Sequence, residues 1–201
     1  MKLSPRSEEQ NLHIKDERRE QILSAALKIF ATRGFAAAKI SDIVAMGGIS
    51  HGLLYHYFNS KEEIFLALVR RAVNVAGQSI IMVDRMPITS LEKVRQAAKY
   101  ILQGINLGKE SSYYFMIVVQ ASVMEGTPEE KLKYLEGMEI PVQTMVQILK
   151  QGQQTGEIRK GDAMEMAIAF FSAIQGIAIY KLAMQDFKMP DYEILVNMVK
   201  Q

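Results

Sequence analysis

The sequence predicts an all-α protein, with a head of three helices followed by a larger helical domain. No segment alternates strictly between apolar and polar residues, as a half-buried strand would. Apolar residues instead recur every three or four positions. Four capping signals, beginning at Ser60, Thr89, Thr127 and Asp162, each mark the start of a helix.

Composition is that of an ordinary soluble globular protein. Of the 201 residues, 49% are hydrophobic and 23% charged, and there is no cysteine, which excludes disulfides and thiolate metal sites. Met1 to Glu20 lacks the apolar core of a secretory signal, and the longest apolar run, 166–180, falls short of the ~18 residues that a membrane span needs. We therefore expect a cytoplasmic protein with no membrane association.

Positive charge gathers at the N-terminal end. Up to Lys61 there are nine basic and six acidic side chains, a charge of +3, and the total of +2 leaves −1 for the remainder. This modest excess favours a polyphosphate partner for the head.

The head is predicted to follow a mobile N-terminal arm, residues 1–15. Its first helix spans 16–33, with Ile22, Ala26, Ile29 and Phe30 on the apolar face, and Gly34 ends it.

A second helix, 39–46, is followed by Gly47 and Gly48, which permit a tight turn. Ser50 is placed as the N-cap of a third helix, on which Leu54 and Phe58 face inward. The residues left facing outward are His51, Gly52, Tyr55 and His56. Two short helices joined by a glycine turn form a helix-turn-helix, whose second helix can enter a major groove.

These residues resemble the TetR family of bacterial transcriptional regulators. The match lies in Gly48-Ile49-Ser50, in Leu54-Tyr55-His56-Tyr57-Phe58 and in Lys61-Glu62-Glu63, and it covers about the first third of the chain. Three positions depart from the family pattern: Ala38-Lys39 replaces a Thr-Thr pair, and Val44 replaces an alanine.

The resemblance implies a DNA-binding set. Tyr55 and Lys61 would contact phosphates, and a lysine at position 39 could do the same. The residues expected at base edges or the adjacent backbone are His51, Gly52, Leu53 and His56, and Ser41 and Ser50 complete the set. The alternative is that Tyr55 and His56 are solvent-exposed side chains of a surface helix and have no role in DNA binding.

Beyond the head, residues 62–201 are expected to form a ligand-binding and dimerisation domain. A long helix starts at Lys61 and runs towards Val83, and another runs from Thr89 towards Leu107. Residues 113–124 are apolar on most sides and predict a buried helix, with a strand as the alternative that periodicity leaves open. Thr127 and Asp162 cap two more helices, Pro141 should kink its helix, and Pro190 should start a short last one.

The second domain carries eleven of the thirteen methionines together with many aromatic residues, a lining that can adapt to apolar ligands. By the family resemblance some of these line a cavity for a small apolar or amphipathic effector, although core filling is the alternative for each. The candidates are Tyr100, Tyr113, Phe115, Met116, Met124, Met145, Phe170 and Ile174.

The helix 162–185 is apolar nearly all round, which an outer helix of a monomer would not tolerate. We expect it to form half of a homodimer interface, and the alternative is a helix buried within one subunit. The candidate interface residues are Ala169, Ala173, Gly176, Ile177, Tyr180 and Leu195.

Together these features predict a homodimeric repressor that leaves a palindromic operator in double-stranded DNA when it binds its effector. Control by a protein partner or by abundance and non-specific architectural DNA binding are the alternatives. An enzyme is not expected, because the three histidines lie in the arm and head and form no catalytic constellation. His51 and His56 point to different sides of a helix, so no metal site or cofactor is expected.

Overall fold

The computed structural model describes residues 8–124 and 136–201, with side chains from Asp16 onward. The described residues form helices and no strand beyond one isolated bridge between Ile158 and Lys200. The helices are α1 (Glu8–Arg33), α2 (Ile40–Gly47), α3 (His51–Tyr57), α4 (Lys61–Asp84), α5 (Ser90–Leu107), α6 (Lys109–Val123), α8 (Glu139–Thr155), α9 (Ala163–Ala183) and α10 (Glu193–Asn197). The all-α prediction is confirmed.

The chain divides into two compact units, residues 1–68 and 69–201. The division falls inside α4, between Leu68 and Val69, rather than at Lys61 where the sequence placed it. Helix α1 begins at Glu8 and so includes half of the stretch that was expected to be a mobile arm.

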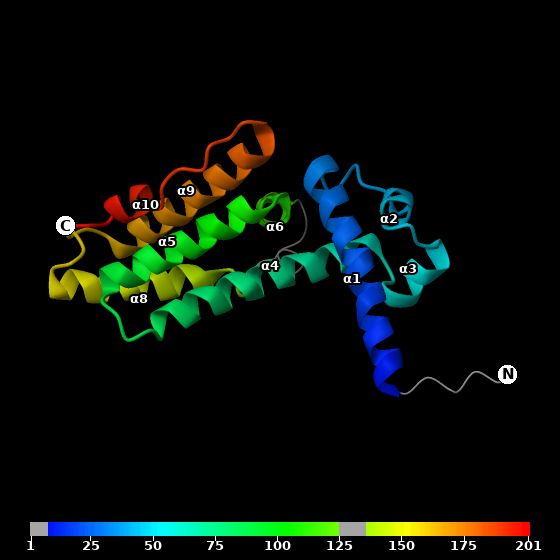
Figure 1. Cartoon of the computed structure of the whole chain (residues 1–201), viewed down its shortest axis with the longest axis horizontal. Coiled ribbons are helices and arrows are strands. Elements are labelled where there is room, and N and C mark those ends of the chain that lie inside the picture. Colours follow the sequence, from blue (N-terminus) through cyan, green and yellow to red (C-terminus); the bar gives the residue numbers. More distant parts are fainter. Residues whose placement is uncertain (1–7, 125–135) are drawn as a thin grey trace. The chain divides into compact units, whose positions relative to one another are not determined.

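The first unit packs α1 against α2, and α3 follows directly (Figure 1). Apolar side chains from α1, α2, α3 and the first part of α4 are buried in its core, because each helix keeps one apolar face. The largest are Ile22, Leu23, Leu27, Phe30, Ile43, Leu54, Ile64, Phe65 and Leu68. Phe30, Phe35 and Phe65 form an aromatic cluster with ring centroids 4.9 to 5.8 Å apart.

The second unit is built around α9, which packs against both α6 and α8, while α5 packs against α8 and α10 (Figure 1). Its two described caps follow the prediction: Thr89 Oγ1 accepts from the Glu92 N–H at 3.3 Å, and Asp162 Oδ1 accepts from the Met164 and Glu165 N–H groups. The cap predicted at Thr127 lies outside the described residues.

Three expectations for the second unit need correction. Helix α6 begins at Lys109, and its residues 113–120 are half-buried except Ile117, so it is not a fully buried helix. Pro141 lies in the first turn of α8, where a missing N–H costs nothing, so it kinks no described helix. Pro190 precedes α10 by three residues and does not start it.

Among the helices of the described residues, α4 and α9 are long and apolar enough to cross a membrane on length and composition alone. Polar residues interrupt both helices, so neither contains an uninterrupted apolar run of ~18 residues from which a span would be predicted. Core and interface helices of soluble proteins meet the same two criteria, and α9 carries much of the core of the second unit.

Candidate nucleic-acid interface

The turn between α2 and α3 has the geometry that its glycines predict. Gly48 lies in the left-handed region at φ 60° and ψ 36°, and the Ile49 N–H donates to the Val44 carbonyl at 3.2 Å. Ser50 then caps α3, since its Oγ accepts from the Leu53 N–H at 3.1 Å. The predicted helix-turn-helix and its cap are confirmed.

Helix α3 has one buried and one exposed face. Leu54 is completely buried, and Phe58, which ends the helix, is 2% exposed. Tyr55 is 52% exposed, and His51, Gly52 and His56 are exposed beside it. The helix thus offers hydroxyl and imidazole groups to solvent, with a glycine between them that allows close approach of another surface.

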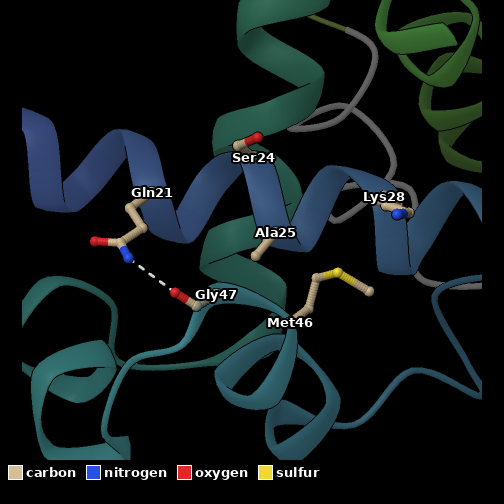
Figure 2. A pocket seen from close by; sticks show the side chains of 6 residues that line it. All are labelled: Gln21, Ser24, Ala25, Lys28, Met46 and Gly47. Atoms are coloured by element: carbon tan, nitrogen blue, oxygen red, sulfur yellow. Dashed lines mark hydrogen bonds between the residues drawn. The ribbon is translucent and has the colours of Figure 1, made fainter.

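Helix α1 holds the turn through a polar contact that no pattern in the sequence predicts. Figure 2 shows the Gln21 side chain on α1 reaching the end of α2, where its Nε2 donates to the Gly47 carbonyl at 2.8 Å. Arg18 Nη1 donates to Gln21 Oε1, also at 2.8 Å, and so fixes the orientation of the amide. The contact joins residues 26 positions apart and ties the start of the turn to α1.

A small open cavity of about 270 Å³ lies beside this contact (Figure 2). Its lining residues are Gln21, Ser24, Ala25, Lys28, Met46 and Gly47. None of them belongs to the predicted DNA-binding set.

The opposite end of α2 is fixed by Asp42. Its carboxylate pairs with Arg33 Nη1 at 2.8 Å and accepts from the Lys39 N–H at 3.2 Å. Desolvation alone would raise the pKa of Asp42, but the Lys39 N–H and the Arg33 guanidinium outweigh it, so this pKa lies below its ordinary value. Both ends of α2 are therefore anchored to α1 or to its own first turn.

The predicted DNA-binding residues fall into two groups. Lys39, Ser41, Ser50, His51, Gly52, Tyr55 and His56 are exposed, and Leu53 is half-buried. Lys61 differs from these, because its side chain is half-buried and its Nζ donates to the carbonyls of Phe35 and Ala38 at 2.9 and 3.1 Å.

The predicted effector residues do not come together as one lining. Met145, Phe170 and Ile174 lie in the core of the second unit, at most 1% exposed, and Phe115 packs against that core. Tyr113, Met116 and Met124 are half-buried, and Tyr100 is 45% exposed. A second open cavity, of about 380 Å³, is lined by Lys150, Gln153, Gln154, Lys160 and Gly161 and includes none of them.

Sequence reasoning missed Ser112 on α6. This side chain is completely buried, and its hydroxyl has no hydrogen-bond partner in the described part of the chain. An unpaired buried hydroxyl is unfavourable, so Ser112 needs a partner or a function.

Helix α9 exposes a broad apolar face. Ile168 and Tyr180 are 53% and 60% exposed. Of the predicted interface residues, Ala169 and Tyr180 are exposed, and Ala173, Gly176 and Ile177 are half-buried. Leu195 is instead 1% exposed in the core of its own unit, where α10 packs against α5.

Among the described side chains, no group of three or more histidines, aspartates or glutamates could hold a metal ion.

The comparisons with known proteins match this architecture. Residues 22–68 match the model of the family "Bacterial regulatory proteins, tetR family". The transcriptional activator FasR of Mycolicibacterium smegmatis is 32% identical over 120 residues, which cover 56% of this chain and 55% of FasR. The fatty acid metabolism regulator protein of Bacillus subtilis is 28% identical over 152 residues, covering 73% of this chain and 74% of that protein.

A solved structure of AibR in complex with isovaleryl coenzyme A and operator DNA superposes with a TM-score of 0.74. It is 17% identical and covers 90% of this chain and 94% of AibR, so it shows a shared fold. The chain thus spans about half the length of FasR and nearly all of AibR. The helix-turn-helix head thus lies inside the segment that matches the tetR family of bacterial regulatory proteins, and the helical second unit shares the fold of AibR.

Proposed function

We propose that this protein is a homodimeric repressor, acting in the bacterial cytoplasm, that binds a palindromic operator and leaves it when an acyl-type effector binds the second unit. The observation that carries the proposal is the two-sided helix α3. Leu54 fixes one side in the core while His51, Tyr55 and His56 stand exposed on the other.

Each exposed group suits a role at DNA. The Tyr55 hydroxyl can contact a phosphate, His51 and His56 can donate or accept at a base edge, and Leu53 can pack on a thymine methyl. Lys39, Ser41 and Ser50, exposed around the same turn, supply a cation and two hydroxyls for the backbone. Two heads ~34 to 36 Å apart would reach successive major grooves on one face of the duplex.

The test is selection of genomic fragments by the purified protein near physiological salt, followed by sequencing. Recovery of one or a few inverted repeats supports the repressor. Broad recovery with no shared motif would replace it with a non-specific architectural binder.

The homodimer is supported by the exposed face of α9. Ile168→Glu places a charge on that face without touching the core of the subunit, and we expect monomers by light scattering together with loss of tight operator binding. Val75→Glu on α4 is the matched control, because Val75 is 62% exposed and Ile168 53%. A dimer that survives Ile168→Glu at micromolar concentration would contradict this interface.

The acyl class is suggested by the relatives, of which one is named a fatty acid metabolism regulator and another was solved with isovaleryl coenzyme A. In this chain the unpaired Ser112 hydroxyl is a group that could meet a carbonyl or carboxylate of such a ligand. Thermal-shift titration with free fatty acids and their coenzyme A thioesters tests the class. Ser112→Ala should leave the free protein as stable or more stable, and reduce the shift caused by the ligand.

If no acyl compound shifts unfolding or releases DNA, control by a protein partner or by abundance becomes the better explanation, and the DNA-binding part of the proposal stands unchanged.

A further inference from the structure

Lys61 begins α4, yet its charged group points back into the head. Its Nζ donates to two backbone carbonyls, those of Phe35 at 2.9 Å and Ala38 at 3.1 Å. The same nitrogen lies 4.4 Å from the centroid of the Phe35 ring, within the range of a cation–π contact. Two of the three N–H bonds of the ammonium are thus in use, and a ring covers it.

The loop that Lys61 contacts connects α1 to α2 and leads directly into the first turn of α2. It runs from Gly34, whose N–H caps α1 by donating to the Phe30 carbonyl at 2.9 Å, to Lys39, which is the N-cap of α2. Inside it the Ala38 N–H donates to the Gly34 carbonyl at 3.2 Å, and the Ala38 side chain is 2% exposed. Two further loop carbonyls, those of Phe35 and Ala38, accept from the Lys61 ammonium, which has only donors to offer.

Helix α3 depends on the position of this loop. Only Gly48, Ile49 and Ser50 separate α2 from α3, so a shift at the start of α2 is passed to the exposed face of α3. A phosphate that took the place of either carbonyl at the Lys61 ammonium would release the loop at the moment of DNA binding.

We infer that Lys61 is a positioning residue for DNA binding, acting by holding the loop before α2, and not a phosphate contact of the kind the family resemblance implies. This inference rests on the proposed DNA-binding function, but the loop contact itself can be tested without DNA.

The two roles predict different salt dependence. A lysine that neutralises a phosphate releases counterions, so its loss lowers the slope of log K against log[salt] by about 0.9. For the positioning role, Lys61→Met should weaken operator binding about tenfold at every salt concentration with an unchanged slope. Lys61→Arg should fail to restore affinity, because a longer guanidinium with its donors in one plane does not occupy the ammonium's position between the two carbonyls.

Lys39→Met is the matched control. Lys39 is exposed and its Nζ has no hydrogen bond that the structure records, so as a phosphate contact its loss should lower the slope by about 0.9. Operator fragments recovered by genomic selection serve as the probe, with full-length protein throughout.

Amide hydrogen exchange in the absence of DNA supplies the second readout. Lys61→Met should speed exchange of the Ala38 amide and of the first turn of α2, and leave α9 unchanged. If Lys61→Met fails to fold, Lys61→Arg gives the same test, since it keeps the charge and loses the fit.

A lowered salt slope for Lys61→Met, full affinity of Lys61→Arg, or unchanged exchange in the loop would each overturn the inference. Failure of the wild-type protein to select any operator would instead refute the proposed function, while the exchange experiment would still report on Lys61.

Discussion

Replacing Gly52 with alanine should separate the stability of the head from its affinity for DNA. Gly52 lies in the first turn of α3, and a Cβ added there meets no atom within 4 Å. Alanine loses less backbone entropy than glycine in a helix, so Gly52→Ala should stabilise the free protein by about 0.5–1 kcal/mol. For a chain of this size that raises Tm by about 1–4 °C.

The same methyl group should obstruct the operator. If α3 approaches the base edges closely at Gly52, the added carbon overpacks the interface by about 1–3 kcal/mol, which is about 5- to 150-fold in affinity. Thermal unfolding and operator titration of the same sample measure the two effects.

Gly48→Ala is the contrasting variant. Its Cβ also meets nothing within 4 Å, but Gly48 has a φ of 60°, so the left-handed conformation should cost about 1–2 kcal/mol and lower Tm. Operator affinity unchanged in Gly52→Ala would refute the close approach of α3 to DNA at this position. A lower Tm for that variant would refute the reasoning about open space.

Three further outcomes are expected. Asp162→Ala removes the cap of α9 and should cost about 1 kcal/mol, lowering Tm by about 2–4 °C, whereas an unchanged Tm would show that the cap contributes nothing. Hydrogen bonds from Arg95 and then Gln96 hold the pKa of Glu92 below its ordinary 4.5, so the unfolded chain binds more protons and stability falls as the pH drops below that value. Arg95→Met should flatten this loss in denaturant titrations between pH 7 and 3.5, and equal losses in both proteins would contradict the assignment. Tyr55→Phe should weaken binding to all sequences alike while His51→Ala changes sequence preference, and identical effects at every site would refute these roles.

The helix-turn-helix was predictable from sequence because its determinants are local. A left-handed glycine at 48 and a serine cap at 50 act on residues within a turn of themselves, and the caps at Thr89 and Asp162 work in the same way. Such local signals can be recognised in a sequence without knowledge of the fold.

The contacts that support the site were not predictable, since they join distant residues. Gln21 donates a hydrogen bond to the Gly47 carbonyl and Lys61 to the Phe35 carbonyl, and the residues of each pair are 26 positions apart. The residues adjacent to Gln21 or Lys61 in the sequence do not indicate these partners. Leu195 shows the same limit: its apolar character is visible in the sequence, but whether it packs inside one subunit depends on how α10 is turned.

The division of the chain inside α4 has a consequence for building chimeric regulators. Leu68 and Val69 are consecutive residues of one helix, so no loop absorbs a change in length at the junction. Each residue inserted there turns the following part of the helix by about 100° and advances it by ~1.5 Å. A head grafted onto a different sensor would therefore have to be joined in helical phase. Insertions of seven residues, close to two full turns, should be tolerated far better than insertions of two.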